Sequence, residues 1–270
     1  MLESSMTTTR VHIVGCRRSG TTLMMELLWY GFRFSGRDEH EVSVFEPIPS
    51  GHNLYLTKKP PDTLRIHRIF EADPDLHVIA MLRDPRAVIT STHPNRPNVY
   101  FSSYWRWQEY LRAVEPLLGH PRFQLVHYEQ LVKDPARVQR DLERRFQFLQ
   151  RTRAFIDFPE GANVPPGLAI DSLNGVRDLD VSRITGWQEH LPRINSQLRD
   201  NPRMAQDLID AGYEKDDAWT RMLQGIDHYS QTYKDEPPGK LRTIETNVRF
   251  WRKTRSYLRS LRSRTKAAHE

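Results

Sequence analysis

Short apolar runs alternate along the chain with segments whose apolar residues recur every three or four positions. The first run, at 11–14, ends at Gly15, and residues 23–28 follow with the spacing of a helix. The run at 77–82 is continuously apolar and of strand length, which is typical of a parallel strand buried on both faces. A third run lies at 123–127. The pattern predicts an α/β fold with a P-loop-like parallel sheet flanked by helices.

Other elements are predicted from shorter or weaker patterns. They are a short strand at 42–45 and helices at 63–72, 87–93, 99–118, 131–150, 184–191 and 204–211. The aromatic residues within 99–118 recur at helical spacing, which favours a packing face over a cofactor site. Residues 158–173 are rich in proline and glycine, and we expect a loop there that contributes to acceptor binding.

The composition is that of a soluble protein, with 38% hydrophobic and 27% charged residues in a chain of 270. The single cysteine, Cys16, excludes an internal disulfide framework and fits a reducing compartment. No apolar run approaches the ~18 residues of a membrane span, and the first ten residues have no apolar signal core. We therefore expect a cytoplasmic protein.

The net charge of +6 is concentrated at the C-terminal end. Residues 237–270 contain ten Lys or Arg residues but only two acidic residues, Glu245 and Glu270. Residues 241–266 also keep an apolar stripe, which predicts a basic amphipathic helix. We divide the chain into a main domain, 1–236, and this tail, 237–270. The tail could dock on the domain, make a peripheral contact with an anionic membrane, or bind a partner. The main domain is not basic, which argues against nucleic-acid binding.

A glycine turn separates the first predicted strand from the first predicted helix. Gly15-x-x-x-x-Gly20 followed by two threonines has the frame of the nucleotide P-loop, but Thr21 stands where that motif has lysine. Such a turn points unpaired backbone N–H groups and the positive end of the helix dipole at an anion, usually phosphate. An ordinary glycine turn is the alternative, but it does not explain Arg17 and Arg18 within the turn.

A second charged turn, 83–86, follows the run at 77–82 and leads into another helical segment. Ligands of open α/β sheets bind at such carboxyl strand ends. Arg83 and Ser91 lie about two helical turns apart and could hold a further phosphate between them. A surface ion pair is the alternative for Arg83.

Acidic and basic residues between the two turns are candidates for proton transfer and charge stabilisation. Four carboxylates, Asp38, Glu39, Glu41 and Glu46, lie just downstream of the first helix, and as a group they are candidates for a general base. A solvated acidic loop is the alternative. Lys58 and Lys59 precede Pro60 and Pro61, which hold them in extended backbone. The scattered histidines and the lack of paired cysteines predict no metal site.

Taken together, these motifs resemble the sulfotransferases that use PAPS (3′-phosphoadenosine 5′-phosphosulfate), most closely the tyrosylprotein and carbohydrate sulfotransferases. The resemblance covers most of 11–213. It rests on three motifs in order, at 16–23, at 83–86 with Ser91, and at 126–132.

The resemblance implies where the donor binds. In the family the first turn holds the 5′-phosphosulfate, and the matching residues are Arg17, Arg18, Ser19, Gly20, Thr21 and Thr22. The second motif holds the 3′-phosphate, and its matches are Arg83 and Ser91, with Ser172 and Arg183 in the region that closes over this phosphate. Tyr128 matches a tyrosine that lies against the adenine.

The resemblance also implies the chemistry, which is transfer of a sulfuryl group to a hydroxyl without a metal ion. Arg18 and Lys58 would stabilise charge on the bridging oxygen, and Glu39 or Glu41 would be the base, with Glu46 ranked behind them. The small-molecule cytosolic enzymes have a histidine base two residues after the lysine, where this chain has Pro60. Phenols and steroids are therefore less favoured as acceptors than a sugar, glycan or glycolipid.

Two other functions fit parts of the pattern. A small-molecule kinase could use the first turn as a degenerate P-loop, although Thr21 argues against it. A non-catalytic nucleotide- or membrane-binding module could retain the anion site and depend on the basic tail.

Overall fold

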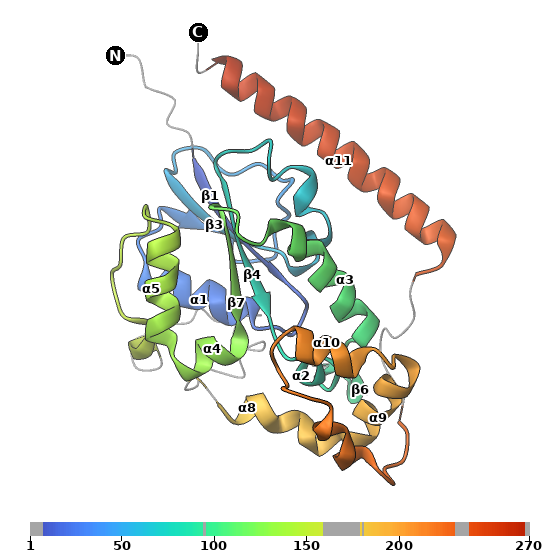
Figure 1. Ribbon diagram of the computed structural model, residues 1–270. Coiled ribbons are helices and arrows are strands. Elements are labelled where there is room, and N and C mark those ends of the chain that lie inside the picture. Colours follow the sequence, from blue (N-terminus) through green and yellow to red (C-terminus); the bar gives the residue numbers. More distant parts are fainter. Residues whose placement is uncertain (1–7, 94–95, 159–178, 180, 230–237, 268–270) are drawn as a thin grey trace.

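The computed structural model describes residues 8–93, 96–158, 179, 181–229 and 238–267, and at its centre is a five-stranded parallel sheet. The strands are β1 (Thr9–Gly15), β2 (Gly36–Arg37), β3 (Leu54–Lys58), β4 (Leu76–Leu82) and β7 (Phe123–His127). Their order is β2-β3-β1-β4-β7, so β1 is central. Because every pair is parallel, the carboxyl ends of the strands meet at one edge (Figure 1). The predicted α/β fold is confirmed.

The strand register brings the two predicted turns together. Ile13 of β1 lies beside Lys58 on β3 and Ile79 on β4, and Gly15 lies beside Met81. Gly15 has a φ of 145°, and a Cβ atom there would lie 2.5 Å from the Met81 carbonyl oxygen. Only glycine lets the first turn start this close to β4.

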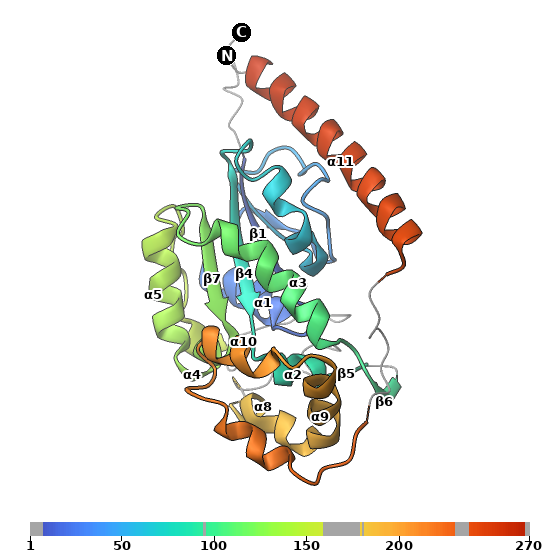
Figure 2. The ribbon, with the colours of Figure 1, turned by 45° about the vertical axis from the view of Figure 1, so that its right-hand side comes forward.

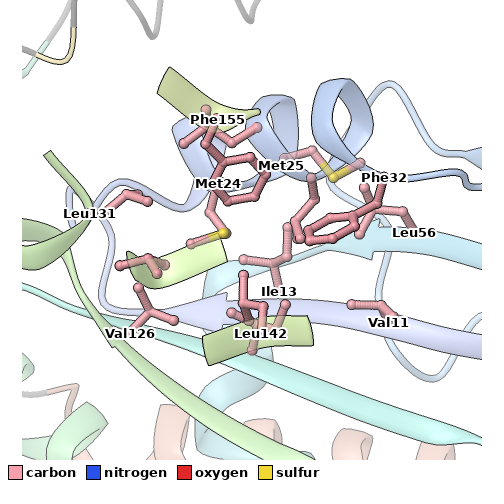
Figure 3. Close-up of a cluster of buried hydrophobic side chains, with 14 of the residues drawn as sticks. Val11, Ile13, Met24, Met25, Phe32, Leu56, Val126, Leu131, Leu142 and Phe155 are labelled. Atoms are coloured by element: carbon pink, nitrogen blue, oxygen red, sulfur yellow. The ribbon is translucent and has the colours of Figure 1, made fainter. Parts of the chain in front are cut away.

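Both faces of the sheet are buried. On one face Val11, Ile13 and Leu56 point toward Met24 and Met25 of α1 (Thr21–Gly31) (Figure 3). Two further helices, α4 (Tyr128–Lys133) and α5 (Pro135–Arg145), complete this layer. On the other face Val14, Val78 and Ala80 pack against residues of 66–70 and the helix α3 (Tyr104–Val114). This two-sided burial explains why the strands read as continuous apolar runs.

A group of C-terminal helices packs against α2 (Pro85–Ile89) and α3. It consists of α8 (Ser182–Thr185), α9 (Leu191–Asp200) and α10 (Met204–Asp210) (Figure 2). Arg86 links this group of helices to the second turn. Its guanidinium donates to Asp84 at 2.7 Å and to Glu214 at 2.5 Å, and it lies 4.1 Å from the centre of the Trp187 ring. These contacts compensate the burial of its charge and raise its pKa.

Two predicted elements are wrong because side chains form contacts that local pattern does not reveal. Residues 42–45 are not a strand: Val44 N–H donates to the Asp62 carboxylate at 2.6 Å, and the Val44 carbonyl accepts from Arg10 at 2.7 Å. The predicted helix 63–72 is replaced by two 3₁₀ segments, Pro60–Leu64 and Ile66–Arg68. Thr63 Oγ1 donates to the Pro60 carbonyl and accepts from Gly15 N–H, which ties the first segment to the turn.

Other predicted helices exist but are shorter or divided. The predicted helix 87–93 ends at Ile89, and Thr92–His93 (β5) pairs with Arg96–Tyr100 (β6), so α3 begins only at Tyr104. The predicted helix 131–150 is divided because Pro135 cannot continue a helix, and Asp134 caps α5 by accepting from Arg137 N–H.

Of the last two predicted helices, one is shorter than predicted. Only the start of 184–191 is α-helix, followed by a 3₁₀ segment, Gly186–His190. The helix at 204–210 is confirmed.

The tail forms one long helix, α11 (Lys240–Ala267), as the stripe predicted. It runs along the outside of the domain in both views (Figures 1 and 2). Phe250 and Tyr257 pack on the Phe45 ring, with ring centres 6.0 and 6.1 Å apart, and the Tyr257 hydroxyl donates to the Asp73 carboxylate. Among the described residues no helix is both long and apolar enough to cross a membrane.

Candidate active site

A pocket of about 230 Å³ opens at the carboxyl edge of the sheet, where the two turns meet. Residues from widely separated segments line it: Arg17, Arg18, Gly20, Thr21, Thr22, Leu23, Glu41, Pro60, Arg83, Phe101, Tyr128 and Arg183. Nine of these were predicted as site residues from the sequence. The fold thus brings the first motif, the second motif and the third motif to one cavity.

The first turn has a backbone built to expose N–H groups. Arg18 has a φ of 71° and is the one non-glycine residue in the described part of the chain with a positive φ. Ser19 closes the turn, since its N–H and its hydroxyl both donate to the Cys16 carbonyl, at 3.1 and 2.5 Å. Its side chain is buried there and does not line the pocket. A left-handed arginine costs about 1–3 kcal/mol, and such strain is commonly retained at ligand sites.

The N-terminus of α1 faces the pocket without a side-chain cap. Gly20, the N-cap residue, has a φ of 91° and makes no side-chain cap hydrogen bond. The N–H groups of Thr21, Thr22 and Leu23 have no partner within the helix by its geometry. These donors and the helix dipole favour an anion at this point.

Gly20 also makes room for an aromatic ring. A Cβ atom at this position would lie 2.6 Å from Cδ2 of Tyr128. Tyr128 therefore packs directly on the first turn, while its other neighbour, the Arg83 guanidinium, lies 4.3 Å from the ring centre. The tyrosine links the two turns and presents its ring to the pocket.

The two turns are joined by arginine hydrogen bonds. Arg83 donates from Nη1 to the Arg18 carbonyl at 3.1 Å and from Nη2 to the Arg183 carbonyl at 2.9 Å. Arg18 donates from Nε to Ser91 Oγ at 2.7 Å. Ser91 therefore contacts the site through Arg18 rather than by lining the pocket.

Cations dominate the electrostatics of this cavity. Burial, together with the positive charges of Arg83 and Arg183, lowers the pKa of Arg18. Burial is also the main cause of the lowered pKa of Arg83. Among the described residues that line the pocket, Glu41 is the one carboxylate, against four arginines. Concentrated positive charge of this kind is stabilised by a multiply charged anion.

Lys58 lies at the end of β3 and contacts a residue that lines the pocket. Its Nζ donates to Thr22 Oγ1 at 2.9 Å, so the ammonium group is held beside the first turn of α1. Burial lowers the pKa of Lys58, and the negative charges of Glu41 and Glu26 partly oppose this shift. Lys59 contributes a backbone bond to Ile13 and does not line the pocket.

The structure separates the three candidate bases. Glu41 lines the pocket close to Lys58, whereas neither Glu39 nor Glu46 does. Glu39 and Glu41 are both exposed, so only the pocket lining distinguishes them, and Glu46 lies 3.5 Å from Lys253 of α11. The remaining predicted residue, Ser172, lies outside the described residues, as does most of the predicted acceptor loop at 158–173.

A buried polar network behind the pocket was not predicted. Arg10 donates to the carbonyls of Ser43, Val44 and Glu46, and Thr57 Oγ1 contacts both Arg10 and His12. The network fixes residues 43–46, which begin two positions after Glu41. One feature of the sequence could have indicated this network: Arg10 and His12 are polar residues at alternate positions, just before and within a predicted strand that is otherwise apolar.

Asp62 is the anionic member of this network. Burial alone would raise its pKa, but the His12 ring nitrogen at 3.4 Å and hydrogen bonds from Val44 N–H and Ser43 outweigh burial and lower it. Burial lowers the pKa of His12. The pair therefore places an ionised carboxylate against a neutral imidazole.

Phe101 belongs to the aromatic segment 99–118 that was predicted to be a packing face, and for this residue the prediction is wrong. It precedes α3 and lines the pocket, with the Arg17 guanidinium 5.8 Å from its ring centre. The aromatic residues of α3 itself, such as Tyr104 and Trp107, are buried in the core, as predicted for a packing face. Within the described ranges, no group of three or more potential metal ligands occurs.

Comparison with known proteins gives one match to a family. The sequence model described as "Sulfotransferase family" matches residues 34–148, a segment that includes Lys58, the second turn and Tyr128 but not the first turn. No curated protein matches the chain.

Several solved structures with a similar fold are described as sulfotransferases, at low identity. The sulfotransferase domain of the Synechococcus PCC 7002 olefin synthase is 15% identical, with 67% of this chain and 88% of that chain covered and a TM-score of 0.45. Mouse sulfotransferase SULT7A1 complexed with PAP is 13% identical, with 80% and 88% covered and a TM-score of 0.47. The sulfotransferase from Alicyclobacillus acidocaldarius is 12% identical, with 80% and 99% covered and a TM-score of 0.41.

Proposed function

We propose that this chain is a PAPS-dependent sulfotransferase that transfers the sulfuryl group to an acceptor hydroxyl, on a sugar, glycan or glycolipid. The observation that carries the proposal is the convergence of Arg18 and Arg83, from two separate strand ends, on one cationic pocket. Glu41 also lines this pocket, and Lys58 donates to the lining residue Thr22. The family match over 34–148 supports it.

The pocket offers distinct contacts for the two ends of the donor. The uncapped N-terminus of α1 and Arg18 would bind the 5′-phosphosulfate. Arg83 and Arg183 would bind the 3′-phosphate, with Ser91 orienting Arg18 between them. The Tyr128 ring, which lies on Gly20, would stack on the adenine.

The reaction needs a base on the acceptor side and cations on the donor side. Glu41 would take the proton of the acceptor hydroxyl, whose oxygen then forms a bond to sulfur. The bond from sulfur to the bridging oxygen breaks, and its electron pair stays on the 5′-phosphate of the product. Arg18, Lys58 and the N–H groups of α1 would stabilise that developing charge.

Glu41 is preferred as base for a positional reason. It lines the pocket and its charge acts on Lys58, whereas Glu46 is engaged with Lys253 on the outside of the domain. Thr21, in place of the P-loop lysine, removes the cation that contacts the terminal phosphates of a nucleoside triphosphate, which disfavours the kinase alternative.

Calorimetric titration with PAP, the desulfated donor, tests the proposal directly. We expect PAP to bind far more tightly than ATP, with or without Mg²⁺. Preferential binding of ATP–Mg²⁺ would contradict the proposal. A transfer assay with labelled PAPS and a panel of glycan and glycolipid acceptors then separates an enzyme from a non-catalytic module, because the module would bind PAP and transfer nothing.

A further inference from the structure

The helix α11 has two chemically different faces, and only one of them contacts the domain. At 3.6 residues per turn, Phe250, Tyr257 and Leu261 share one face. On this face Tyr257 is buried, Leu261 packs on the core beneath it, and the Arg65 guanidinium lies 5.0 Å from the Phe250 ring centre. This docked face attaches the second half of the helix to the domain.

A second face, about 140° around the helix from the first, points away from the domain. Its first three turns are apolar, formed by Leu241, Ile244, Val248 and Trp251, which are 79, 59, 44 and 52% exposed. Among the described residues ten large hydrophobic side chains are exposed, and four of them lie on this face. A concentrated apolar stripe of this kind indicates a binding surface rather than scattered surface residues.

The same face becomes cationic toward the C-terminal end. Arg255 and Arg262 continue the spacing of the apolar residues, with Arg252 and Arg259 beside them, and all four are exposed. The Arg255 guanidinium lies 4.6 Å from the centre of the Trp251 ring, so the apolar and cationic halves are contiguous. In the described part of the tail, Glu245 is the one acidic residue.

We infer that this outward face of α11 binds the surface of an anionic lipid bilayer. The apolar stripe would enter the boundary between headgroups and acyl chains, and the arginines would contact lipid phosphates. Tryptophan beside arginine is favoured at that depth, because the indole ring and the guanidinium each have an apolar and a polar side. The docked face holds the domain against the membrane while the outward face is occupied.

Charge favours a lipid surface over a second copy of this chain. A partner helix packed along the entire face would bury Arg255 and Arg262, and a copy of the same face supplies only more arginine opposite them. Burying unpaired charge is strongly unfavourable. An anionic bilayer instead neutralises the arginines and accepts the apolar residues in the same plane.

Co-sedimentation of the full chain with vesicles tests the inference without nucleotide or acceptor. We expect binding to phosphatidylcholine vesicles that contain phosphatidylglycerol, weakening as salt rises, and little binding to phosphatidylcholine alone. Two double variants, Val248→Ser with Trp251→Ser and Arg255→Glu with Arg262→Glu, should each lower the partition coefficient by about tenfold or more.

Two single substitutions outside α11 serve as controls, because each makes the same kind of change at another exposed position. Leu118→Ser removes a side chain that is 50% exposed, and Arg140→Glu reverses an exposed charge on α5. Neither should alter vesicle binding. The inference fails if the full chain does not bind anionic vesicles, or if the α11 variants bind these vesicles as well as the controls do. It also fails if the α11 variants abolish a dimer or the capture of an acidic protein while leaving vesicle binding intact.

Discussion

Arg83, just beyond β4, donates a hydrogen bond to the backbone carbonyl of Arg18, 65 positions earlier in the chain, at 3.1 Å. The bond joins the second turn to the one position where a non-glycine residue in the described chain adopts a left-handed backbone. Arg83 thus has two functions in the proposed site, holding the first turn in place and providing charge for the 3′-phosphate.

Removing the Arg83 side chain should mainly weaken donor binding. A hydrogen bond between charged groups contributes about 1.5–3 kcal/mol, so Arg83→Ala should raise the Kd for PAP by roughly 10- to 100-fold. Arg83→Lys should recover only part of the loss, because lysine lacks the planar fork that reaches two carbonyls. Titration calorimetry measures both, with Arg140→Ala on α5 as the control. An unchanged Kd in Arg83→Ala would show that the second turn does not hold the phosphate.

Lys58 should affect turnover more than binding. Its charge is most useful when the bridging oxygen becomes anionic, so Lys58→Ala should lower kcat by about 10²–10³-fold with a smaller change in the Kd for PAP. Arg18→Ala should behave in the same direction. Steady-state kinetics and calorimetry on the same preparations separate the two quantities. Equal losses in kcat and affinity would instead indicate a general binding role.

The lowered pKa of Lys58 predicts a pH effect. In the proposed mechanism the protonated form is the active one, and because burial lowers the pKa, the charge is lost at a lower pH than for an ordinary lysine. The value of kcat/KM should therefore fall on the alkaline side, at a pH below the usual lysine pKa of about 10.4. Lys58→Arg should shift this alkaline limb to higher pH. An identical limb in the arginine variant would assign the titration to another group.

Glu41 should be distinguishable from its neighbours by substitution. Glu41→Gln keeps the shape of the side chain but removes the base, and we expect kcat to fall by about 10²–10⁴-fold. Glu39→Gln and Glu46→Gln are matched controls that should retain most activity, because neither residue lines the pocket. A larger loss in either control than in Glu41→Gln would reassign the base.

Substitution of Gly20 should be unfavourable for two reasons, its positive φ and the close approach of the Tyr128 ring, and the two effects can be measured separately. Gly20→Ala adds a methyl group 2.6 Å from the Tyr128 ring at a φ of 91°, so we expect loss of PAP binding and of about 1 kcal/mol or more in the free energy of unfolding. Gly119→Ala has a similar φ of 81°, but nothing lies within 4 Å of the added atom. Urea unfolding of both variants measures the backbone cost in Gly119→Ala and the additional steric cost in Gly20→Ala. Intact PAP binding by Gly20→Ala would argue against the first turn as the donor site.

The sequence by itself determined the elements whose causes are local. The apolar runs predicted the strands β1, β4 and β7, the frame from Gly15 to Thr22 predicted a turn that exposes N–H groups, and the stripe at 241–266 predicted α11. Each depends on residues close in the chain, because periodicity and glycine positions act directly on the backbone. The meeting of the two turns also followed, since parallel strands end at one edge.

Contacts between distant residues were decided only by the tertiary structure. Which of three glutamates reaches the pocket depends on how Arg10 and Asp62 hold the backbone just after Glu41, from positions 34 and 18 residues away from Val44. The same long-range bonds replaced the strand predicted at 42–45. Likewise, the stripe of α11 did not reveal that the docked face and the outward apolar face are different. The surface that the helix packs against settled this, because burial is a property of the assembled chain and not of a segment.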